Sequence, residues 1–314
     1  MTTLPEAGLA AAIACNAMGW QEATAERFPT GSGHYVFDVR RADGDTRVVV
    51  RMGHADQRQE LAEGVALMRR LSGLGVPLPV VLASDTGGRH PWMLLERLRG
   101  TDLGNVIATL DDGQLRTIAT KVAAAQRATL GFGAAGRYGY AASAETAPYG
   151  TWPEVVAANL NRSRQRMASA GLFSLVGIER AERLLARRWG ELVSWPAKPF
   201  LHDTTTRNVI VGPDGTFSGI VDVDDLCFGD PRWAPALTLA VLLAHHWPVQ
   251  YVGYWLEAAG LEDDHLFRLY VAVFLLDLMS EHGQRFNGNE RPSKPEERER
   301  VLRAFEAAIA AAER

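Results

Sequence analysis

The chain has 314 residues, of which 47% are hydrophobic and 22% are charged, and its formal net charge at pH 7 is −4. This is the composition of a globular protein with a sizeable core, and the length fits one large domain or two smaller ones. The charge balance excludes the basic excess that neutralises a nucleic-acid backbone, so we expect no nucleic-acid partner.

Cysteine usage and apolar runs indicate where the chain resides. Cys15 and Cys227 are too few and too far apart in sequence for a disulfide framework, which favours a reducing cytoplasm. The apolar stretch 7–18 follows Glu6 and no basic residue, unlike a secretory signal, and the apolar run 236–244 is too short to span a bilayer. We therefore expect a cytoplasmic protein without a membrane partner.

Residues 1–99 predict a small antiparallel sheet with one main helix. Alternating apolar runs, with the hairpin signal Asp43-Gly44 between two of them, predict the first three strands. The expected elements are a short helix over 4–18, strands over 22–28, 34–42 and 46–52, a helix over 56–71, and strands over 77–83 and 92–98. From Gly100 onward the pattern is helical, interrupted only by one central hairpin, so we expect a second domain over residues 100–314.

The central hairpin brings polar side chains to one end of its two strands. Strand-like runs 209–211 and 219–221 flank a turn signal, so Asp203 and Asn208 before the first strand come close to Asp222 after the second. Carboxylate and amide oxygens are suitable ligands for Mg²⁺. A further carboxylate can orient a hydroxyl and take its proton during phosphoryl transfer. Taken singly, the same residues are also ordinary turn formers and a solvated strand end.

The spacing of these residues extends into a longer motif. It consists of His202-Asp203, Asn208 five residues after the Asp, an apolar pair ending in Asp222, and Gly229-Asp230-Pro231. On these residues the chain resembles the aminoglycoside phosphotransferase and choline kinase family, which is similar in fold to protein kinases. Two positions depart from the family pattern. Leu201 stands where the family usually has His, and Val223 stands where it often has an aromatic residue.

This resemblance implies a fold class and a reaction. The fold is α+β and protein-kinase-like, with a small sheet-containing lobe (1–99) and a larger helical lobe (100–314). The reaction is transfer of the γ-phosphoryl group of ATP or GTP, with Mg²⁺, to a hydroxyl of a small molecule. Asp203 is implied as the catalytic base, and Asn208 and Asp222 as metal ligands. A monomer or a homodimer is expected.

The resemblance also implies residues that bind the nucleotide. Residues 1–100 contain no lysine, so Arg51 is expected to take the place of the lysine that contacts the phosphates. Glu63 is the expected partner of Arg51; Glu60 is the other candidate, and both are alternatively exposed helix charges. The remaining nucleotide-binding positions are Ser32 and Gly33 in a glycine-containing turn over the phosphates, and the backbone groups of Leu95 to Leu98 around the base.

Four acids near the expected acceptor side favour a cationic acceptor such as an aminoglycoside, if they line a cleft: Asp225, Asp230, Asp277 and Glu281. If they do not, they are ordinary surface acids. An antibiotic is therefore the expected acceptor. The alternatives are a metabolite of the choline, homoserine or sugar type, and a catalytically weak protein that binds nucleotides.

Overall fold

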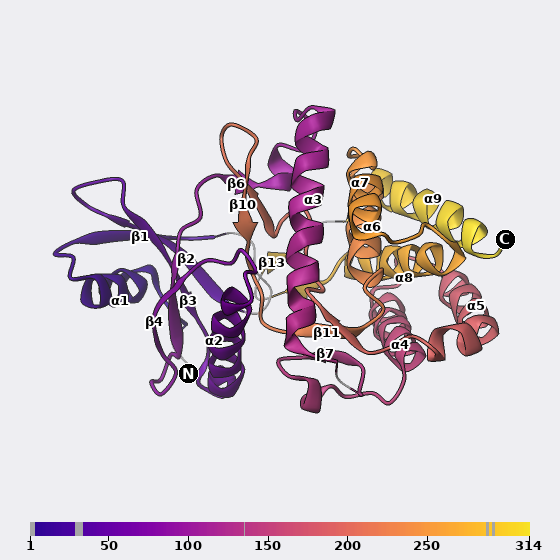
Figure 1. The fold of residues 1–314 in the computed structure, drawn as a ribbon, viewed down its shortest axis with the longest axis horizontal. Coiled ribbons are helices and arrows are strands. Elements are labelled where there is room, and N and C mark those ends of the chain that lie inside the picture. Colours follow the sequence, from indigo (N-terminus) through magenta and orange to yellow (C-terminus); the bar gives the residue numbers. More distant parts are fainter. Residues whose placement is uncertain (1–3, 29–33, 135, 287–288, 291–292) are drawn as a thin grey trace.

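The computed structural model describes residues 4–28, 34–134, 136–286, 289–290 and 293–314. Figure 1 shows the N-terminal sheet on one side and a group of helices on the other, with the long helix α3 (Asp112–Ala128) between them. No helix in the described part of the chain is both long enough and apolar enough to cross a membrane.

The N-terminal part is a five-stranded antiparallel sheet with the order β1-β2-β3-β5-β4. Buried and less buried residues alternate along β2, as expected for a strand whose inner face packs on the core. One face packs against α1 through Ala10, Ile13 and Ala14. Helix α2 packs against the sheet through Leu61 and Met68. The elements are α1 (Ala7–Met18), β1 (Ala23–Arg27), β2 (Tyr35–Arg41), β3 (Arg47–Met52), η1 (Ala55–Gln57), α2 (Arg58–Gly73), β4 (Val81–Asp85) and β5 (Trp92–Glu96).

The chain leaves this sheet at Gly100, where the backbone has a φ of +118°. A Cβ at this position would lie 2.0 Å from the carbonyl oxygen of Val211, so only glycine fits. Directly afterwards β6 (Thr101–Asp102) pairs with β9 (Val209–Val211), which belongs to the central hairpin. The connection between the two parts therefore runs next to the hairpin. The domain boundary between residues 99 and 100 stays a prediction.

The C-terminal part is built around α8 (His265–Glu281), which is apolar on nearly all sides because it packs against α4, α6 and α9. Asp264 caps this helix by accepting a hydrogen bond from Phe267 N at 2.8 Å. The other elements are η2 (Leu103–Asn105), η3 (Thr129–Phe132), β7 (Gly139–Ala141), η4 (Ala144–Thr146), α4 (Trp152–Ala170), α5 (Val176–Val193), β8 (Lys198–Phe200), β10 (Phe217–Ile220), β11 (Leu226–Gly229), α6 (Trp233–His245), α7 (Gln250–Ala259), β12 (Arg285–Phe286), β13 (Asn289–Glu290) and α9 (Pro295–Ala312).

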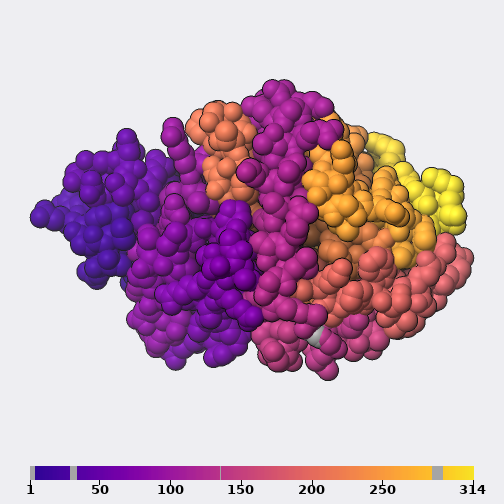
Figure 2. All heavy atoms as spheres, viewed as in Figure 1, coloured from indigo at the N-terminus to yellow at the C-terminus, as the bar shows by residue number. Residues whose placement is uncertain are grey.

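The sequence predicted that the central hairpin would be the only β-structure beyond Gly100, and this was wrong. Short strands β7 and β8 both pair with β11, and β12 pairs with β13. Strands of two to four residues are too short for an alternating pattern to appear in the sequence. The central hairpin itself is confirmed as β9 and β10, and Figure 2 shows its turn at the surface beside α3.

Candidate active site

The β9–β10 hairpin holds the three residues expected at its end. Val221 N donates to Asn208 O at 2.9 Å, which extends the pairing beyond the strands and places Asn208 opposite the residue that precedes Asp222. Asn208 Nδ2 donates to the backbone oxygen of Asp203 at 3.0 Å and closes the loop between these two residues. The Asp203 carboxylate accepts from Thr205 Oγ1 at 2.8 Å through Oδ1, which fixes its orientation.

The environment of Asn208 and Asp222 suits a hard divalent cation. Because Asn208 Nδ2 is held by Asp203, the amide presents its oxygen, an acceptor, away from that bond. The Asp222 side chain is 55% exposed, so its carboxylate is accessible. Asp222 also has a φ of 61°, in the left-handed region that a residue other than glycine seldom adopts. Such backbone strain, of about 1–3 kcal/mol, tends to persist at functional positions.

Arg51 on β3 lies beside this end of the hairpin, as the sequence suggested, but its partners are different from the expected one. Its guanidinium is buried and forms an ion pair with Asp224 through Nη2, and with Asp222 through Nη1 at 3.2 Å. The same Nη2 is 2.7 Å from His34 Nδ1. Burial alone would lower the pKa of Arg51, but the two carboxylates outweigh it and raise the pKa above its usual value. The side chain therefore stays charged.

The expected pair of Arg51 with Glu63 is not formed in this structure. Glu63 Oε1 accepts from Gln59 Nε2 at 2.7 Å, one turn away on the exposed face of α2. The other candidate, Glu60, contacts His34 instead, with Oε1 3.9 Å from His34 Nε2.

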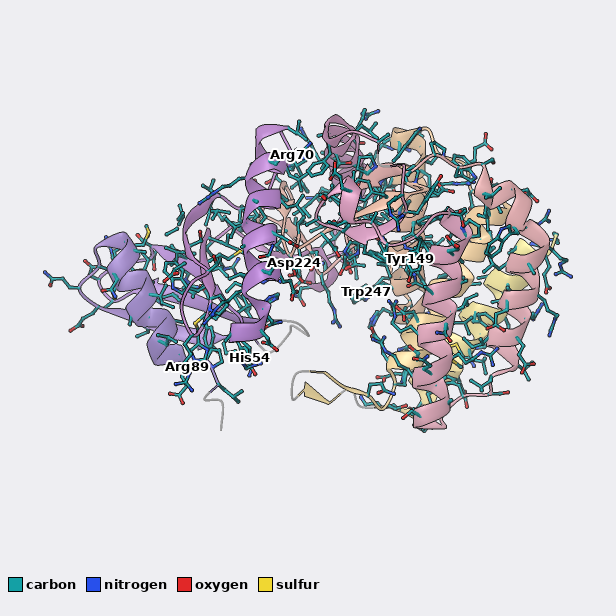
Figure 3. The ribbon with its side chains drawn as sticks, turned by 90° about the horizontal axis from the view of Figure 1, so that it is seen from below. His54, Arg70, Arg89, Tyr149, Asp224 and Trp247 are labelled. Carbon is teal, nitrogen blue, oxygen red and sulfur yellow. The ribbon has the colours of Figure 1, made fainter. Side chains whose placement is uncertain are left out.

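Glu60 and Glu63 line a pocket of about 220 Å³ together with Tyr140, Thr146, Asp224 and Asp225. Burial and the charge of Asp224 raise the pKa of Glu60. Figure 3 shows Asp224 beside α2, between the sheet and the C-terminal helices.

His34 is a buried residue of this site that the sequence did not single out. Because its Nδ1 accepts from Arg51, the neutral ring carries its proton on Nε2. Burial, followed by the positive charge of Arg51, lowers the pKa of His34 from 6.5 to about 4. Ser32 and Gly33, predicted to lie over the phosphates, fall outside the described residues.

The low pKa of His34 predicts a loss of stability in acid. Between pH 6.5 and about 4 the unfolded chain binds a proton that the folded chain does not, so stability falls as the pH drops. Over this window we expect the free energy of unfolding to lose up to about 3 kcal/mol. The His34→Asn variant keeps an acceptor for Arg51 but does not titrate. Denaturant unfolding of both proteins from pH 7 to 4 measures the effect, and parallel pH curves for the two would contradict it.

Support for the loop around Asp203 comes from helix α3. Gln126 donates from Nε2 to Leu201 O at 2.8 Å and to Thr204 Oγ1 at 3.1 Å, and its Oε1 accepts from Leu201 N at 2.9 Å. Leu201 is buried, where the family pattern has His. The side chain of Gln126 thus holds the loop through the backbone of Leu201 and the side chain of Thr204. Sequence reasoning missed Gln126 because nothing in an alanine-rich helix marks one glutamine as a loop support.

His202 adds a second support on the other side of the loop. Its Nε2 lies 2.5 Å from Asp225 Oδ1, and its ring meets Tyr140 edge-on with the ring centres 4.9 Å apart. Burial lowers the pKa of His202, but the hydrogen bond and charge of Asp225 outweigh it, so the net shift is upward. Asp225, expected to contact the acceptor, is thus engaged by the residue next to Asp203.

The other acids expected on the acceptor side differ in burial and in their partners. Asp230 is fully buried and accepts hydrogen bonds from Arg232 and Tyr270, so a substrate cannot reach it, and the expected role of Asp230 is corrected to a structural one. Asp277 lies 3.2 Å from Arg162 and 3.6 Å from Arg166. Glu281 is partly buried at the end of α8.

The residues expected around the base lie where the two parts of the chain join. Leu95 is buried on β5, paired with β3 and β4. Leu98 lies in the connection to β6, and its backbone oxygen accepts from Arg97 Nη1 at 2.9 Å. A Cβ on Gly219 would lie 2.8 Å from the Leu98 side chain, so this connection packs closely on the central hairpin.

Comparisons with known proteins agree with this architecture. The chain is similar to a thermostable mutant of aminoglycoside phosphotransferase APH(4)-Ia, solved as a ternary complex with AMP-PNP and hygromycin B, with a TM-score of 0.66 and 16% identity over 96% of this chain and 98% of that one. It is similar to APH(3'')-Id from Streptomyces rimosus ATCC10970 in complex with ADP and streptomycin, with a TM-score of 0.59 and 18% identity over 85% and 98% of the two chains.

A third similar structure is a putative fructosamine-3-kinase from Haemophilus somnus 129PT, with a TM-score of 0.60 and 14% identity over 96% of each chain. At these identities the likeness shows the fold alone, and it confirms the predicted protein-kinase-like α+β class. The search of curated proteins finds no match. The sequence profile of the phosphotransferase enzyme family matches residues 24–270. The chain therefore belongs to the phosphotransferase enzyme family.

Proposed function

We propose that the protein transfers the γ-phosphoryl group of ATP or GTP to a hydroxyl group of a small molecule. The observation that carries this proposal is the convergence of Asp203, Asn208 and Asp222 at one end of the β9–β10 hairpin, with the charged Arg51 next to them. The family match supports it, and so do the similar structures solved with AMP-PNP and with ADP.

Asp203 is proposed to act on the acceptor hydroxyl. Since Thr205 occupies its Oδ1, the carboxylate has a fixed orientation and can present Oδ2 to an incoming hydroxyl. In the transfer, the hydroxyl oxygen forms a bond to the γ-phosphorus while the bond to the bridging β–γ oxygen breaks, and the hydroxyl proton passes to Asp203. Gln126 and His202 keep the loop in place during this step.

Asn208 and Asp222 are proposed to hold Mg²⁺, which binds few protein carboxylates together with phosphate oxygens. When bound, such an ion offsets negative charge on the phosphates. Arg51 is proposed to contact the phosphates as well, because its charged guanidinium can donate hydrogen bonds to phosphate oxygens.

Two classes of acceptor deserve testing. Two of the similar structures were solved with hygromycin B and with streptomycin bound, which supports an aminoglycoside-like antibiotic. Two of the four acids expected to attract a cationic acceptor are already paired, because Arg232 neutralises Asp230 and two arginines lie beside Asp277. A metabolite such as a sugar derivative is therefore the second candidate, and the fructosamine-3-kinase similarity points the same way.

The test is a coupled assay of nucleoside diphosphate release with Mg-ATP and Mg-GTP. The panel contains aminoglycosides, other antibiotics, amino alcohols and glycated or free sugars, with the Asp203→Asn variant as the blank. Acceptor-dependent release that the blank lacks would establish the activity and its substrate class. Nucleotide binding without release on any acceptor would favour a catalytically weak nucleotide-binding protein, and no nucleotide binding at all would refute the proposal.

A further inference from the structure

We propose that Asp224, with His34, positions Arg51 for the nucleotide phosphates, in place of a glutamate on helix α2. The inference rests on the proposed function, since it assigns how one nucleotide-binding side chain is held. It concerns a residue that the sequence motif leaves without a role, two positions after Asp222.

The contacts of Arg51 divide its guanidinium into two ends. Nη2 is held on one side by the Asp224 carboxylate and on the other by His34 Nδ1 at 2.7 Å. Nη1 contacts Asp222 Oδ1 at 3.2 Å. The side chains of Arg51 and His34 are 6% and 2% exposed, so the contact between Nη2 and His34 forms where water competes little, whereas the Asp224 side chain is 34% exposed and lies at the edge of the buried region. Nη2 is therefore the anchored end of the guanidinium.

The opposite end faces the residue proposed to hold the cation. If the Asp222 carboxylate turns toward a bound cation, Nη1 becomes available to phosphate oxygens while Nη2 stays fixed. A charged side chain that keeps one anchor loses less freedom on binding a ligand than one that must be ordered from solvent. The anchor thus prepares Arg51 for phosphate in advance.

Neither Glu60 nor Glu63 of helix α2 forms an ion pair with Arg51. The Glu63 carboxylate is engaged by Gln59, and Glu60 is more than half exposed. Gly64 of this helix faces Asp224, and a Cβ at this position would make an ordinary van der Waals contact with Asp224 Oδ1, at 3.7 Å. The carboxylate that holds Arg51 therefore belongs to Asp224, in the segment after the hairpin. The hairpin positions Asp224 as it positions Asp222, which lies two residues earlier in the chain.

The experiment compares Asp224→Asn, Asp224→Glu and Glu63→Gln with the wild type, and uses Asp45→Asn as the matched control. Asp45 is fully exposed on the loop between β2 and β3 and also carries one negative charge. We expect Asp224→Asn to weaken Mg-ATP and Mg-ADP binding about tenfold or more, and to raise KM for the nucleotide more than it lowers kcat. Asp224→Glu, which keeps the carboxylate, should recover part of the affinity. A larger effect for Glu63→Gln than for Asp224→Asn would overturn the proposal.

A second readout does not depend on nucleotide. Phenylglyoxal modifies accessible arginines, and peptide mass spectrometry identifies the site. Arg51 should be protected in the wild type and become reactive in Asp224→Asn, while the buried Arg232, paired with Asp230, stays protected in both and shows that the fold is intact. Unchanged protection of Arg51 would refute the anchor. If the wild type bound no nucleotide, the proposed function would fail, whereas the labelling would still decide whether Asp224 holds Arg51.

Discussion

Replacing Asp203 with Asn should lower kcat about a thousandfold, within the range of about 10²–10⁴ attributed to a positioned acid or base. Asparagine has the same shape, so its Oδ1 still accepts from Thr205 and the loop stays closed by Asn208. It cannot accept a proton from the acceptor hydroxyl. Nucleotide affinity should change by less than about threefold, because Asp203 acts on the acceptor and not on the phosphates.

Asp214→Asn is the matched control for this prediction. Asp214 lies in the turn at the far end of the same hairpin, where its Oδ1 accepts from Thr216 Oγ1 at 2.7 Å. The amide oxygen of asparagine can keep that bond. Steady-state kinetics on the acceptor identified in the panel should show wild-type kcat for this control. If Asp203→Asn retained more than a tenth of the wild-type kcat, Asp203 would not be the base.

The parts of the site that follow from the sequence are those fixed by local structure. A two-stranded hairpin sets the distance between the residues just before its first strand and just after its second. The spacing of Asp203, Asn208 and Asp222 therefore predicted their proximity without knowledge of the rest of the fold. The N-terminal strands were also predictable, because the alternation along β2 and β3 is long enough to read.

The partners of these residues were not predictable because they come from distant parts of the chain. Asp224 is 173 residues from Arg51, and Gln126 is 75 residues from Leu201. Neither pair has a spacing that a strand or helix period would produce. Arg51 offers five donors where a lysine would offer one compact ammonium group, so more than one carboxylate can pair with it, and packing decides which one does. Glu63 and Asp224 were equally plausible on charge alone.

Burial explains why the role expected for Asp230 had to be corrected. In the sequence, Asp230 follows β11 within the motif Gly229-Asp230-Pro231 and resembles the other acids near the site. A Cβ on Gly229 would lie 2.1 Å from the Trp152 ring, so the backbone of this segment packs closely against the core and the adjacent Asp230 is buried. Arg232 follows Asp230 closely enough to be buried with it, and the two charges compensate each other.

Asp230→Ala should therefore destabilise the fold by about 3–5 kcal/mol, the usual cost of removing one partner of a buried ion pair. Arg232 would keep its contact with Asp264, 2.5 Å away, and its position over the Trp195 and Tyr270 rings, while the Tyr270 hydroxyl would lose its acceptor. Denaturant unfolding measures the change. Asp230→Asn, which keeps the size but not the charge, should lose stability by a smaller amount. With either variant, KM for the acceptor, measured on the folded fraction at low temperature, should match the wild type. A raised acceptor KM without a loss of stability would instead support the direct role in acceptor binding that the sequence had suggested.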